Sequence, residues 1–505
     1  MAFDARAKQD SDLSIIIVGT GFSGLGMAIA LKKAGFQSFT LLERAASVGG
    51  TWRDNHYPGC ACDVQSHLYS FSFEQNPTWS RMFARQPEIK AYLENCADKY
   101  GLLPHIQFNA DVTTARYDEA AQRWTVTTRD GRSFEAAIVV SGMGGLSNPA
   151  FPDLPGIGQF TGKTFHSAEW DHDYDLRGKR VAVIGTGASA IQFVPQIQKQ
   201  VAHLDLYQRT PPWIMPKPDR PISEGERGLY RRFPVLQRAY RTALYWTLEA
   251  RVLGFAINPK IMKLLEGQAR KHIARQIADP ALRAKLTPDF TFGCKRVLIS
   301  DDYYPALAQP NVDVVTDGIR EVRASSVVTT DGVERPVDCI IYGTGFKAQD
   351  PLPRGAIFGR GGVDIVDAWT QGPEAYKGTT VSGFPNLFML MGPNTGLGHS
   401  SMVYMIESQI AYVLDAVLQM RAKGWAAVDV KADRQTRYND GLQAALKKAI
   451  WTAGGCKSWY LNAQGRNTTL WPSFTFKFRQ ALAHFDADNY QVEHAALATA
   501  GSSSR

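Results

Sequence analysis

Residues Ile15-Ile-Ile-Val18-Gly19-Thr-Gly21-Phe-Ser-Gly24 decide how the first part of this 505-residue chain folds. A four-residue apolar run enters three glycines spaced as GxGxxG, and a helical pattern then continues to Gly35. This order predicts a strand, a tight turn and a helix whose N-terminus can hold a diphosphate. Gly19 allows the turn, Gly21 lets the backbone approach the diphosphate, and Gly24 lets the helix pack closely on the strand.

A carboxylate stands at the end of the next expected strand. This strand covers Phe39 to Leu42 and leads directly into Glu43. An acid about 20 residues after the glycine motif accepts hydrogen bonds from ribose hydroxyls and repels a 2′-phosphate. The first site is therefore expected to hold FAD or NAD, and not NADP.

The same pattern returns later in the chain. Val181 to Ile184 enters Gly185-Thr-Gly187-Ala-Ser-Ala190, a helix is expected to Gln200, and Leu204 to Tyr207 forms the next strand. This second strand leads to Arg209, whose cation favours a 2′-phosphate and so selects NADP over NAD. Two nucleotide folds with opposite charge preferences indicate two different nucleotides.

Each half also carries a hairpin signal followed by a buried strand. Asp130-Gly131 and Asp331-Gly332 mark the two hairpins, and the strands after them exit at Gly142 and Gly343. This echo predicts an internal structural repeat. The sequence thus predicts an α/β fold with a first nucleotide domain of residues 1–148 and 352–505, a second of residues 149–217 and 291–351, and a helical insertion of residues 218–290.

Composition limits the classes of partner. The net charge of +8 is expected to be spread over the surface, because the basic clusters are short and isolated, whereas nucleic-acid binding needs a continuous stripe. A mildly positive surface fits an anionic cofactor, and solubility explains it equally well. The most apolar segment, Ala243 to Ile257, contains Glu249 and Arg251, so no membrane span is expected.

The cysteine content indicates a reducing compartment. Six cysteines are sparse for a disulfide scaffold, and the N-terminus has no signal-peptide pattern. We therefore expect a cytoplasmic protein with reduced thiols. Cys60-Ala-Cys62 is spaced too tightly for the redox pair of a disulfide reductase. His166 has no partners at metal-ligand spacing, and no metal site is expected.

Two further motifs carry a family resemblance. The segment between the nucleotide folds, Phe160-Thr-Gly162-Lys-Thr-Phe-His166-Ser-Ala-Glu-Trp170-Asp171, resembles the FxGxxxHxxxW(P/D) fingerprint of type I Baeyer–Villiger monooxygenases, which are class B flavoprotein monooxygenases. Gly50-Thr-Trp52-Arg-Asp-Asn-His-Tyr57-Pro58-Gly59-Cys-Ala-Cys-Asp63 resembles a second motif of that family, GxWxxxxYPGxxxD. With the two nucleotide motifs in the same order, the resemblance covers essentially the whole chain. It implies two Rossmann-like domains, one for FAD and one for NADP.

The resemblance also implies a reaction. It indicates an NADPH- and O₂-dependent FAD monooxygenase that converts ketones to esters or lactones through a C4a-peroxyflavin. Arg296 is implied as the catalytic arginine, paired with Asp63 near the flavin. A guanidinium suits this role because it stabilises an anion without readily giving up a proton. Two alternatives stay open: a nitrogen- or sulfur-oxidising monooxygenase, whose relatives usually carry Tyr or Phe in place of Trp170, and a non-catalytic redox sensor that NADPH reduces.

Individual contacts follow for both cofactors. The expected FAD contacts are Gly19, Gly21, Ser23, Gly24, Glu43, Thr51, Trp52, Asp63, Tyr69, Val112 and Met391. The expected NADP contacts are Gly185, Gly187, Ser189, Ala190, Arg209, Thr210, Lys295 and Trp471, with Lys295 helping Arg209 to hold the 2′-phosphate. Lys457-Ser-Trp459-Tyr460 and Trp471-Pro472 resemble the family segment that closes over NADP, or else their aromatic rings belong to the core.

The fingerprint segment, residues 159–171, is expected to be a linker that acts as a hinge between flavin reduction and oxygenation. Its hinge residues are Phe160, Gly162, His166, Trp170 and Asp171. We expect His166 to serve the hinge rather than acid–base catalysis, and Trp170 to anchor it by packing rather than to touch substrate. The sequence identifies neither the ketone nor the oligomeric state.

Overall fold

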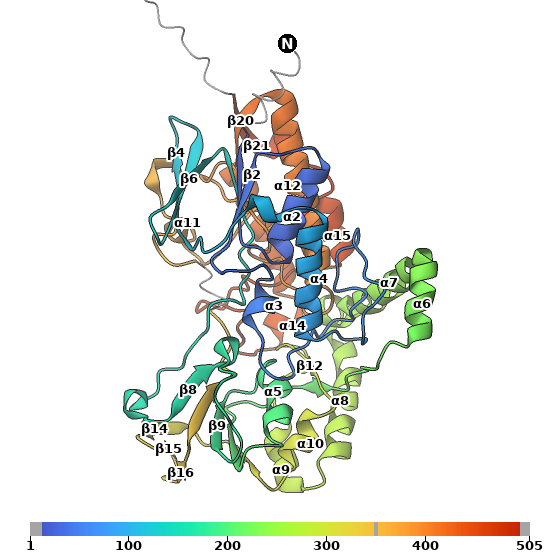
Figure 1. The fold of residues 1–505 in the computed structure, drawn as a ribbon, viewed down its shortest axis with the longest axis vertical. Helices are drawn as coiled ribbons and strands as arrows, with labels where there is room; N and C mark the ends of the chain where they lie inside the picture. The colour runs from blue at the N-terminus through green and yellow to red at the C-terminus, as the bar shows by residue number, and fades with distance from the viewer. Residues whose placement is uncertain (1–12, 348–351, 495–505) are drawn as a thin grey trace, which may run out of the picture.

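The structure is a computed structural model that describes residues 13–347 and 352–494 (Figure 1). Its first framework is a five-stranded parallel sheet in the order β19-β7-β1-β2-β3. The strands are β1 (Ile15–Val18), β2 (Phe39–Leu42), β3 (Ile106–Gln107), β7 (Ile138–Ser141) and β19 (Leu387–Met389). Helix α2 (Phe22–Lys33) joins β1 to β2. The strand, turn and helix expected at the first glycine motif are confirmed.

A second parallel sheet has the order β13-β10-β9-β17-β8. Its strands are β8 (Lys163–His166), β9 (Arg180–Ile184), β10 (His203–Tyr207), β13 (Val312–Val315) and β17 (Cys339–Tyr342). Helix α5 (Ala190–Ile197) joins β9 to β10 and ends three residues before the expected Gln200. The predicted second nucleotide fold is therefore confirmed, with a shorter helix.

The two halves repeat each other element by element. An antiparallel sheet follows β3 in the first half and β13 in the second. It consists of β4 (Val112–Asp118), β5 (Arg123–Thr128) and β6 (Ser133–Ala136) in the first, and of β14 (Ile319–Arg323), β15 (Ser326–Thr329) and β16 (Glu334–Pro336) in the second. β18 (Ile357–Phe358) extends the first of these sheets. Both hairpins turn at the predicted Asp-Gly pairs, which confirms the internal repeat.

The fingerprint segment is more than a linker, and that part of the expectation is wrong. Residues 163–166 form β8, which pairs in parallel with β17 so that His166 lies opposite Tyr342. β8 occupies the place in the second sheet that β19 occupies in the first. The reason is that a sheet edge offers unpaired backbone groups, and an extended four-residue run with a buried Phe165 satisfies them.

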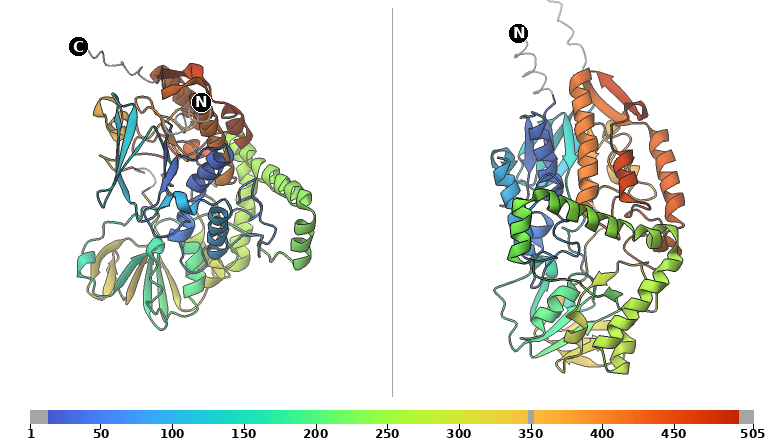
Figure 2. Two further views of the ribbon diagram at one scale, coloured as in Figure 1. Left: turned by 45° about the horizontal axis from the view of Figure 1, so that its top comes forward. Right: turned by 90° about the vertical axis from the view of Figure 1, so that its right-hand side faces the viewer.

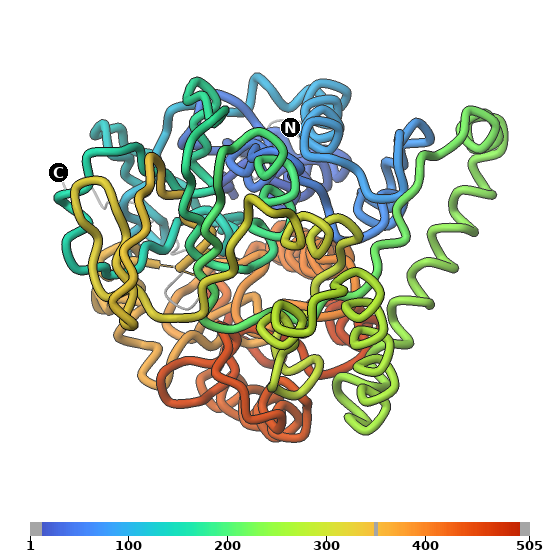
Figure 3. Tube along the Cα trace, turned by 90° about the horizontal axis from the view of Figure 1, so that it is seen from below, coloured from blue at the N-terminus to red at the C-terminus, as the bar shows by residue number. Residues whose placement is uncertain are grey.

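The insertion consists of α6 (Glu224–Arg232), α7 (Pro234–Glu249), a π-helical turn η4 (Leu253–Ile257), η5 (Pro259–Ile261), α8 (Met262–Gln276) and α9 (Pro280–Leu286). A capping box between Ser223 and Glu226 starts α6. α6 and α7 stand at the outer edge of the molecule in Figure 1, in the left view of Figure 2 and in Figure 3, and α7 crosses the near face in the right view of Figure 2. No helix in the described residues combines the length and apolarity that crossing a membrane requires.

The remaining elements close the first domain and connect the layers. They are the helices α3 (Thr51–Asp54), α4 (Gln86–Lys99), α10 (Tyr303–Leu307), α11 (Ile365–Ala368), α12 (Met402–Lys423), α13 (Ala432–Leu446), α14 (Ile450–Ala453) and α15 (Thr475–Ala481), the 3₁₀ turns η1 (Leu103–His105), η2 (Ile157–Gln159), η3 (Ser167–Glu169), η6 (Arg360–Gly362) and η7 (Ala487–Asn489), and the strands β11 (Ile214–Met215), β12 (Leu298–Ile299), β20 (Trp425–Val430) and β21 (Tyr490–His494). α12 packs along α2, so the C-terminal part of the chain covers the first sheet.

Candidate active site

Asp63 and Arg296 meet although 233 residues separate them. The Arg296 Nε donates to Asp63 Oδ2 at 3.1 Å, and a terminal guanidinium nitrogen donates to the same oxygen. The other terminal nitrogen donates to the carbonyl oxygen of Leu397 at 3.4 Å. Both side chains are half-buried, so the pair faces an accessible space rather than the core. The structure thus brings the two implied catalytic residues together.

This contact keeps both groups charged. Burial alone would raise the pKa of Asp63, but the charge and hydrogen bonds of Arg296 outweigh burial and lower it below its ordinary value. The charge of Asp63 raises the pKa of Arg296 above its ordinary value against the effect of burial. A guanidinium in this state is a permanent cation that cannot act as a proton donor to an anion beside it.

Local structure fixes both partners. Asp63 follows a loop in which Cys62 N donates to the carbonyl of Ala84 at 3.0 Å. Arg296 lies two residues before β12, and β12 pairs in parallel with β11, with Leu298 N bonded to the carbonyl of Trp213. The pair therefore joins the second motif of the first domain to a strand that follows the insertion.

Tyr460 supplies a buried hydroxyl beside this pair. The residue is almost fully buried, and its hydroxyl has no hydrogen-bond partner in the described part of the chain. Burial raises the pKa of Tyr460 to about 12, and Arg296 acts in the opposite direction. Trp459 beside it is exposed. An unpaired buried hydroxyl next to Arg296 fits a bound polar group, because buried polar atoms are normally hydrogen-bonded.

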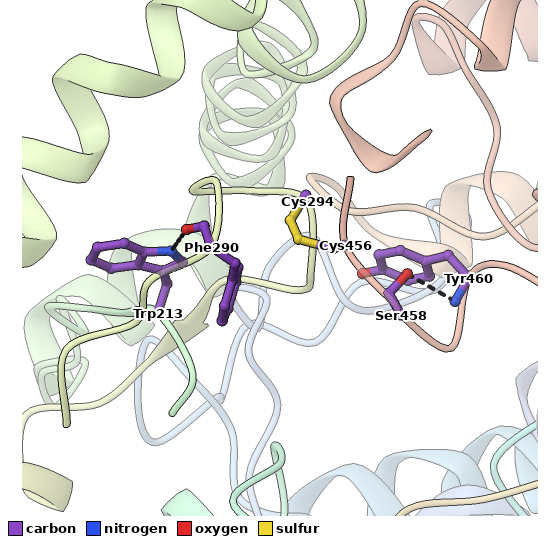
Figure 4. The surroundings of a disulfide bond; sticks show 6 residues. All are labelled: Trp213, Phe290, Cys294, Cys456, Ser458 and Tyr460. Carbon is purple, nitrogen blue, oxygen red and sulfur yellow. Dashed lines mark hydrogen bonds between the residues drawn. A yellow bond between two sulfur atoms is a disulfide. The ribbon is translucent and has the colours of Figure 1, made fainter. Parts of the chain in front are cut away.

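The expectation of six reduced thiols is wrong for two of them. Cys294 and Cys456 form a disulfide with their Cα atoms 6.0 Å apart, and it joins the Arg296 segment to the segment of Ser458 and Tyr460 (Figure 4). Their sequence separation of 162 residues left no spacing signal. Cys60, Cys62, Cys96 and Cys339 are free and buried. Burial raises the pKa of Cys60 to about 12, so its thiolate is suppressed, as expected for an incidental pair.

The N-terminus of α2 fits a diphosphate. Its first turn has no side-chain cap and no acidic residue, which leaves its backbone N–H groups available. A Cβ at Gly24 would overlap with the carbonyl oxygen of Gly19, so only glycine allows this approach of helix to strand. Gly21 is the N-cap and Ser23 is buried in the first turn. These four expected FAD contacts therefore lie together.

Glu43 is buried at the end of β2, as expected, but it is already well paired. Its carboxylate accepts from Thr20 Oγ1 at 2.5 Å and from Ala45 N at 2.9 Å, and Arg53 lies 2.7 Å away. The role of Arg53 was not predicted, although its position within the Trp52 motif, ten residues after Glu43, could have suggested it. The ion pair orients the Glu43 carboxylate without removing its capacity to accept from a ribose hydroxyl.

The other expected FAD contacts lie around the same sheet edge. Thr51 begins α3, and Trp52 Nε1 donates to the Tyr69 hydroxyl at 3.1 Å. Val112 packs on the cluster that contains the ends of β1 and β2. Met391 follows β19 with a positive φ of 62°, held by a hydrogen bond from its backbone N to Gln409.

The second nucleotide site has the complementary charge. α5 also starts without a side-chain cap or an acidic residue, with Ser189 as its N-cap and Ala190 buried behind it. Gly185 has a φ of 106°, and Gly187 is exposed. Thr210 accepts from Thr186 Oγ1 through its carbonyl at 3.1 Å. These residues and Arg209 all lie at the carboxyl ends of β9 and β10, the place expected for NADP.

Arg209 and Lys295 form the expected basic pair. Arg209 is exposed, and burial followed by the charge of Arg209 lowers the pKa of Lys295. The Lys295 ammonium lies 4.6 Å from the centre of the Phe290 ring. A lysine whose charged state is weakened by a neighbouring cation gains from an anion beside it, such as a 2′-phosphate. Trp471 is half-buried and donates through Nε1 to the Phe474 carbonyl at 3.0 Å.

The fingerprint residues surround β8. His166 is fully buried, its Nδ1 accepts from Ala168 N at 3.1 Å, and burial lowers its pKa. Gly162 stands where a Cβ would meet the Phe160 ring and the Asp338 carbonyl. Trp170 is buried between Phe165 and Phe193, and Asp171 pairs with Lys163 at 2.5 Å. His166 and Trp170 lie apart from the Asp63–Arg296 contacts.

Two contacts between the halves were not predicted. Gln192 on α5 accepts from the Tyr57 hydroxyl at 3.0 Å and donates to the carbonyl of Ala61 at 3.0 Å. His172, directly after the fingerprint, lies 2.9 Å from the Nδ1 of His56. Both contacts bind the second motif to the second domain. Gln192 had no sequence signal, whereas His172 is adjacent to a recognised motif.

Comparison with known proteins agrees with this geometry. The model of the family "Flavin-binding monooxygenase-like" matches residues 12–357. A Baeyer-Villiger monooxygenase of Pseudomonas aeruginosa is 60% identical over 97% of this chain and 93% of its own length. A Baeyer-Villiger monooxygenase of Streptomyces coelicolor is 49% identical over 96% of this chain and 94% of its own length.

A solved structure agrees as well. Cyclohexanone monooxygenase from Rhodococcus sp. Phi1, bound to NADP⁺, superposes with a TM-score of 0.86 at 28% identity and covers 96% of this chain and 99% of its own. Membership of one protein family thus accounts for the fold, for the motifs with their Asp63–Arg296 contact, and for the sequence similarity. The chain belongs to the type I Baeyer–Villiger monooxygenases, within the flavin-binding monooxygenase-like family.

Proposed function

We propose that this chain inserts one oxygen atom beside the carbonyl of a ketone, giving an ester or lactone, with Arg296 as the catalytic cation. The observation that carries the residue assignment is the Asp63–Arg296 contact, which lies at the junction of the two nucleotide folds. The enzyme uses FAD and NADPH. When bound, FAD that NADPH has reduced activates O₂ and supplies the oxygen atom for transfer.

The roles of the protein groups follow from their charges. Arg296 holds negative charge on the oxidant and on the former ketone oxygen, and its high pKa prevents it from quenching that charge by proton donation. Asp63 orients the guanidinium because one of its carboxylate oxygens accepts from two nitrogens of Arg296. The Leu397 carbonyl restrains a third donor. Desolvation around the pair strengthens these interactions relative to water.

The two nucleotide sites divide by charge. We propose that Gly19, Gly21, Ser23, Gly24 and Glu43 hold FAD, with Thr51, Trp52, Tyr69, Val112 and Met391 around it. NADP would lie on Gly185, Gly187, Ser189, Ala190 and Thr210, with Arg209 and Lys295 on the 2′-phosphate and Trp471 alongside. The proposal is supported by the uncapped N-termini of α2 and α5 and by the opposite charges after β2 and β10.

The domain division is part of the same proposal. Residues 1–148 and 352–505 would form the FAD domain, 149–217 and 291–351 the NADP domain, and 218–290 the insertion. Its support is that β19 joins the first sheet, although the junction at 348–351 lies outside the described residues. Phe160, Gly162, His166, Trp170 and Asp171 would act as the hinge between the domains. We place the enzyme in the cytoplasm, where its buried disulfide would be shielded from thiols.

Product analysis with Arg296→Ala tests the activity and the assignment together. We expect the natural protein to convert a ketone from a panel of linear, cyclic and aromatic ketones to a product one oxygen heavier. Arg296→Ala should still be reduced by NADPH, while ester formation falls about 10²- to 10³-fold, the usual loss for one electrostatic stabiliser. Arg177→Ala, which breaks an exposed ion pair with Asp175, serves as the matched control.

Each contrary result is informative. If only sulfoxides or N-oxides form from the natural protein, the Baeyer–Villiger activity is refuted. If Arg296→Ala still forms ester at the natural rate, the activity stands and the assignment of Arg296 is wrong. Loss of flavin reduction in Arg296→Ala would show that the arginine acts in cofactor binding instead.

A further inference from the structure

The helical insertion exposes an unusual amount of apolar surface. Of the seventeen large hydrophobic side chains exposed in the described chain, nine lie between residues 229 and 264. The most exposed are Leu264, at 72%, and Val235, at 67%. The others on this surface, which we call the arm surface, include Trp246, Leu253, Ile257 and Ile261. A gathering of exposed apolar side chains on one insertion is typical of an interaction site in a folded protein.

Helix α7 explains how the arm surface arises, because three of its polar side chains are directed inward. Gln237 donates to the carbonyl of Asn76 at 2.7 Å, Arg241 to the carbonyl of His67 at 2.7 Å, and Glu249 accepts from Thr475 Oγ1 at 2.8 Å. All three are buried. These bonds fix α7 to the first domain, and Val235, Leu236 and Trp246 on its opposite side face solvent.

Two threonines also contribute apolar groups to the solvent face of α7. Thr242 and Thr247 return their hydroxyls to the carbonyls of Arg238 and Ala243, four residues earlier, at 2.9 and 2.8 Å. Their methyl groups are therefore left to form the surface between Val235 and Trp246. The same face presents no ionised side chain from residue 239 to residue 250.

Basic residues flank this apolar face in the sequence, and the expectation that the net charge is spread over the whole chain is wrong. Residues 222–277 carry eleven Lys and Arg against four Asp and Glu, so seven of the eight net positive charges of the chain lie in the insertion. Arg232, Arg238, Lys260 and Lys263 are exposed and form no ion pair within the described residues. The sequence pattern did not reveal this net charge, because the basic residues stand in short clusters that apolar residues separate.

We propose that the arm surface of α7, η4, η5 and the start of α8 docks the enzyme on an anionic phospholipid membrane as a peripheral protein. Apolar side chains flanked by Lys and Arg on a helical surface are the pattern that binds at the headgroup level of a bilayer. Basic residues near an anionic surface are attracted to it by the surface potential. A second copy of this chain fits less well, because two arms with net positive charge repel each other.

Vesicle flotation tests this assignment. The holoenzyme is mixed with vesicles of phosphatidylcholine alone or of phosphatidylcholine with phosphatidylglycerol, and the floated protein is measured at low and high salt. We expect flotation with the anionic vesicles and its loss at high salt, where screening shortens the range of the attraction. Arg232→Glu/Lys263→Glu should weaken binding by more than tenfold, since each cation near the surface contributes about fivefold. Val235→Glu/Leu264→Glu should abolish flotation.

Matched variants elsewhere separate the arm surface from general effects. Leu103→Glu/Val363→Glu replaces two side chains that are each 47% exposed outside the insertion, and Lys199→Glu/Lys447→Glu reverses two exposed cations there. Both controls should float like the natural protein, and all four variants should oxidise NADPH normally. Equal flotation of arm and control variants, or no flotation of the natural protein, overturns the proposal. A dimer that Val235→Glu/Leu264→Glu dissociates would overturn it in favour of a second copy.

Discussion

At the scale of single residues, the planar guanidinium of Arg296 is held in one orientation by its three hydrogen-bond donors. Two of its donors go to one oxygen of Asp63 and a third goes to the Leu397 carbonyl, so the plane of the guanidinium is fixed from both sides. A lysine could replace the charge but not this arrangement, because an ammonium has no planar set of donors. The orientation of the cation, as much as its charge, is therefore what the second motif and β12 together provide.

Selection of NADPH over NADH should depend on Arg209 and Lys295. Arg209→Ala is expected to raise the KM for NADPH about 10- to 100-fold, since a hydrogen bond to a charged group contributes about 1.5–3 kcal/mol. The KM for NADH should hardly change, because NADH lacks the 2′-phosphate. Lys295→Ala should act in the same direction with a smaller effect. Steady-state kinetics with both cofactors measures this, with exposed Arg320→Ala as the control.

Equal changes in the KM for NADH and in the KM for NADPH would contradict the assignment of the 2′-phosphate to these cations.

The residues that the sequence could predict are those whose chemistry is local to a motif, such as Glu43 and Arg209. Gln192 and the position of Tyr460 beside Arg296 could not be predicted, because each depends on distant segments packing together.

At the scale of elements, the sequence predicted strands and helices where a local pattern specifies them. The two glycine motifs and the two Asp-Gly hairpins are each encoded within a few residues, and all four are confirmed. β8 was missed because its strand character depends on the free edge of β17, which lies over 170 residues away in sequence. The apolar solvent face of α7 was missed for a similar reason: its inward polar residues find partners only on the first domain.

Replacing Asp171, in the loop after β8, should affect the coupling of NADPH oxidation to product formation more than it affects stability. Asp171 pairs with Lys163 and so ties the loop back to the start of β8, next to the His172–His56 contact between domains. Asp171→Ala removes a partly exposed ion pair, and such pairs contribute little to stability, so the melting temperature should stay nearly constant. We expect more hydrogen peroxide per NADPH consumed, measured by a peroxide assay.

Trp170 should behave in the opposite way. It is buried between Phe165 and Phe193, and Trp170→Ala is expected to cost about 3–5 kcal/mol and to lower the melting temperature. Asp175→Ala, which breaks an exposed ion pair outside the loop, is the control for both variants. Unchanged peroxide release in Asp171→Ala would argue against a hinge role for this end of the fingerprint.

At the scale of the whole molecule, the two halves are nearly equivalent in topology but not in charge or in connection. The paired folds meet through Tyr57 with Gln192, Asp63 with Arg296, and His56 with His172. All three contacts involve the second motif, which explains why that motif combines a turn, an aromatic residue and an acid in a short span. The Asp63–Arg296 pair is one of the contacts that hold the halves together, so opening the domains would also release Arg296.

The Cys294–Cys456 disulfide should stabilise this closed arrangement. It links residues 162 positions apart, next to Arg296 on one side and Tyr460 on the other, and closing so long a loop contributes about 4–5 kcal/mol in the chain-entropy view. Thiol titration of the unfolded protein without reductant should find four thiols, and six after reduction. Reductant should lower the melting temperature of the natural protein by several degrees but leave Cys456→Ala unchanged. Ester formation by Cys456→Ala should fall further than its flavin reduction, because the released segment carries Tyr460 away from Arg296. Six titratable thiols before reduction, or equal sensitivity of Cys456→Ala to reductant, would show that the two cysteines do not act as a clamp.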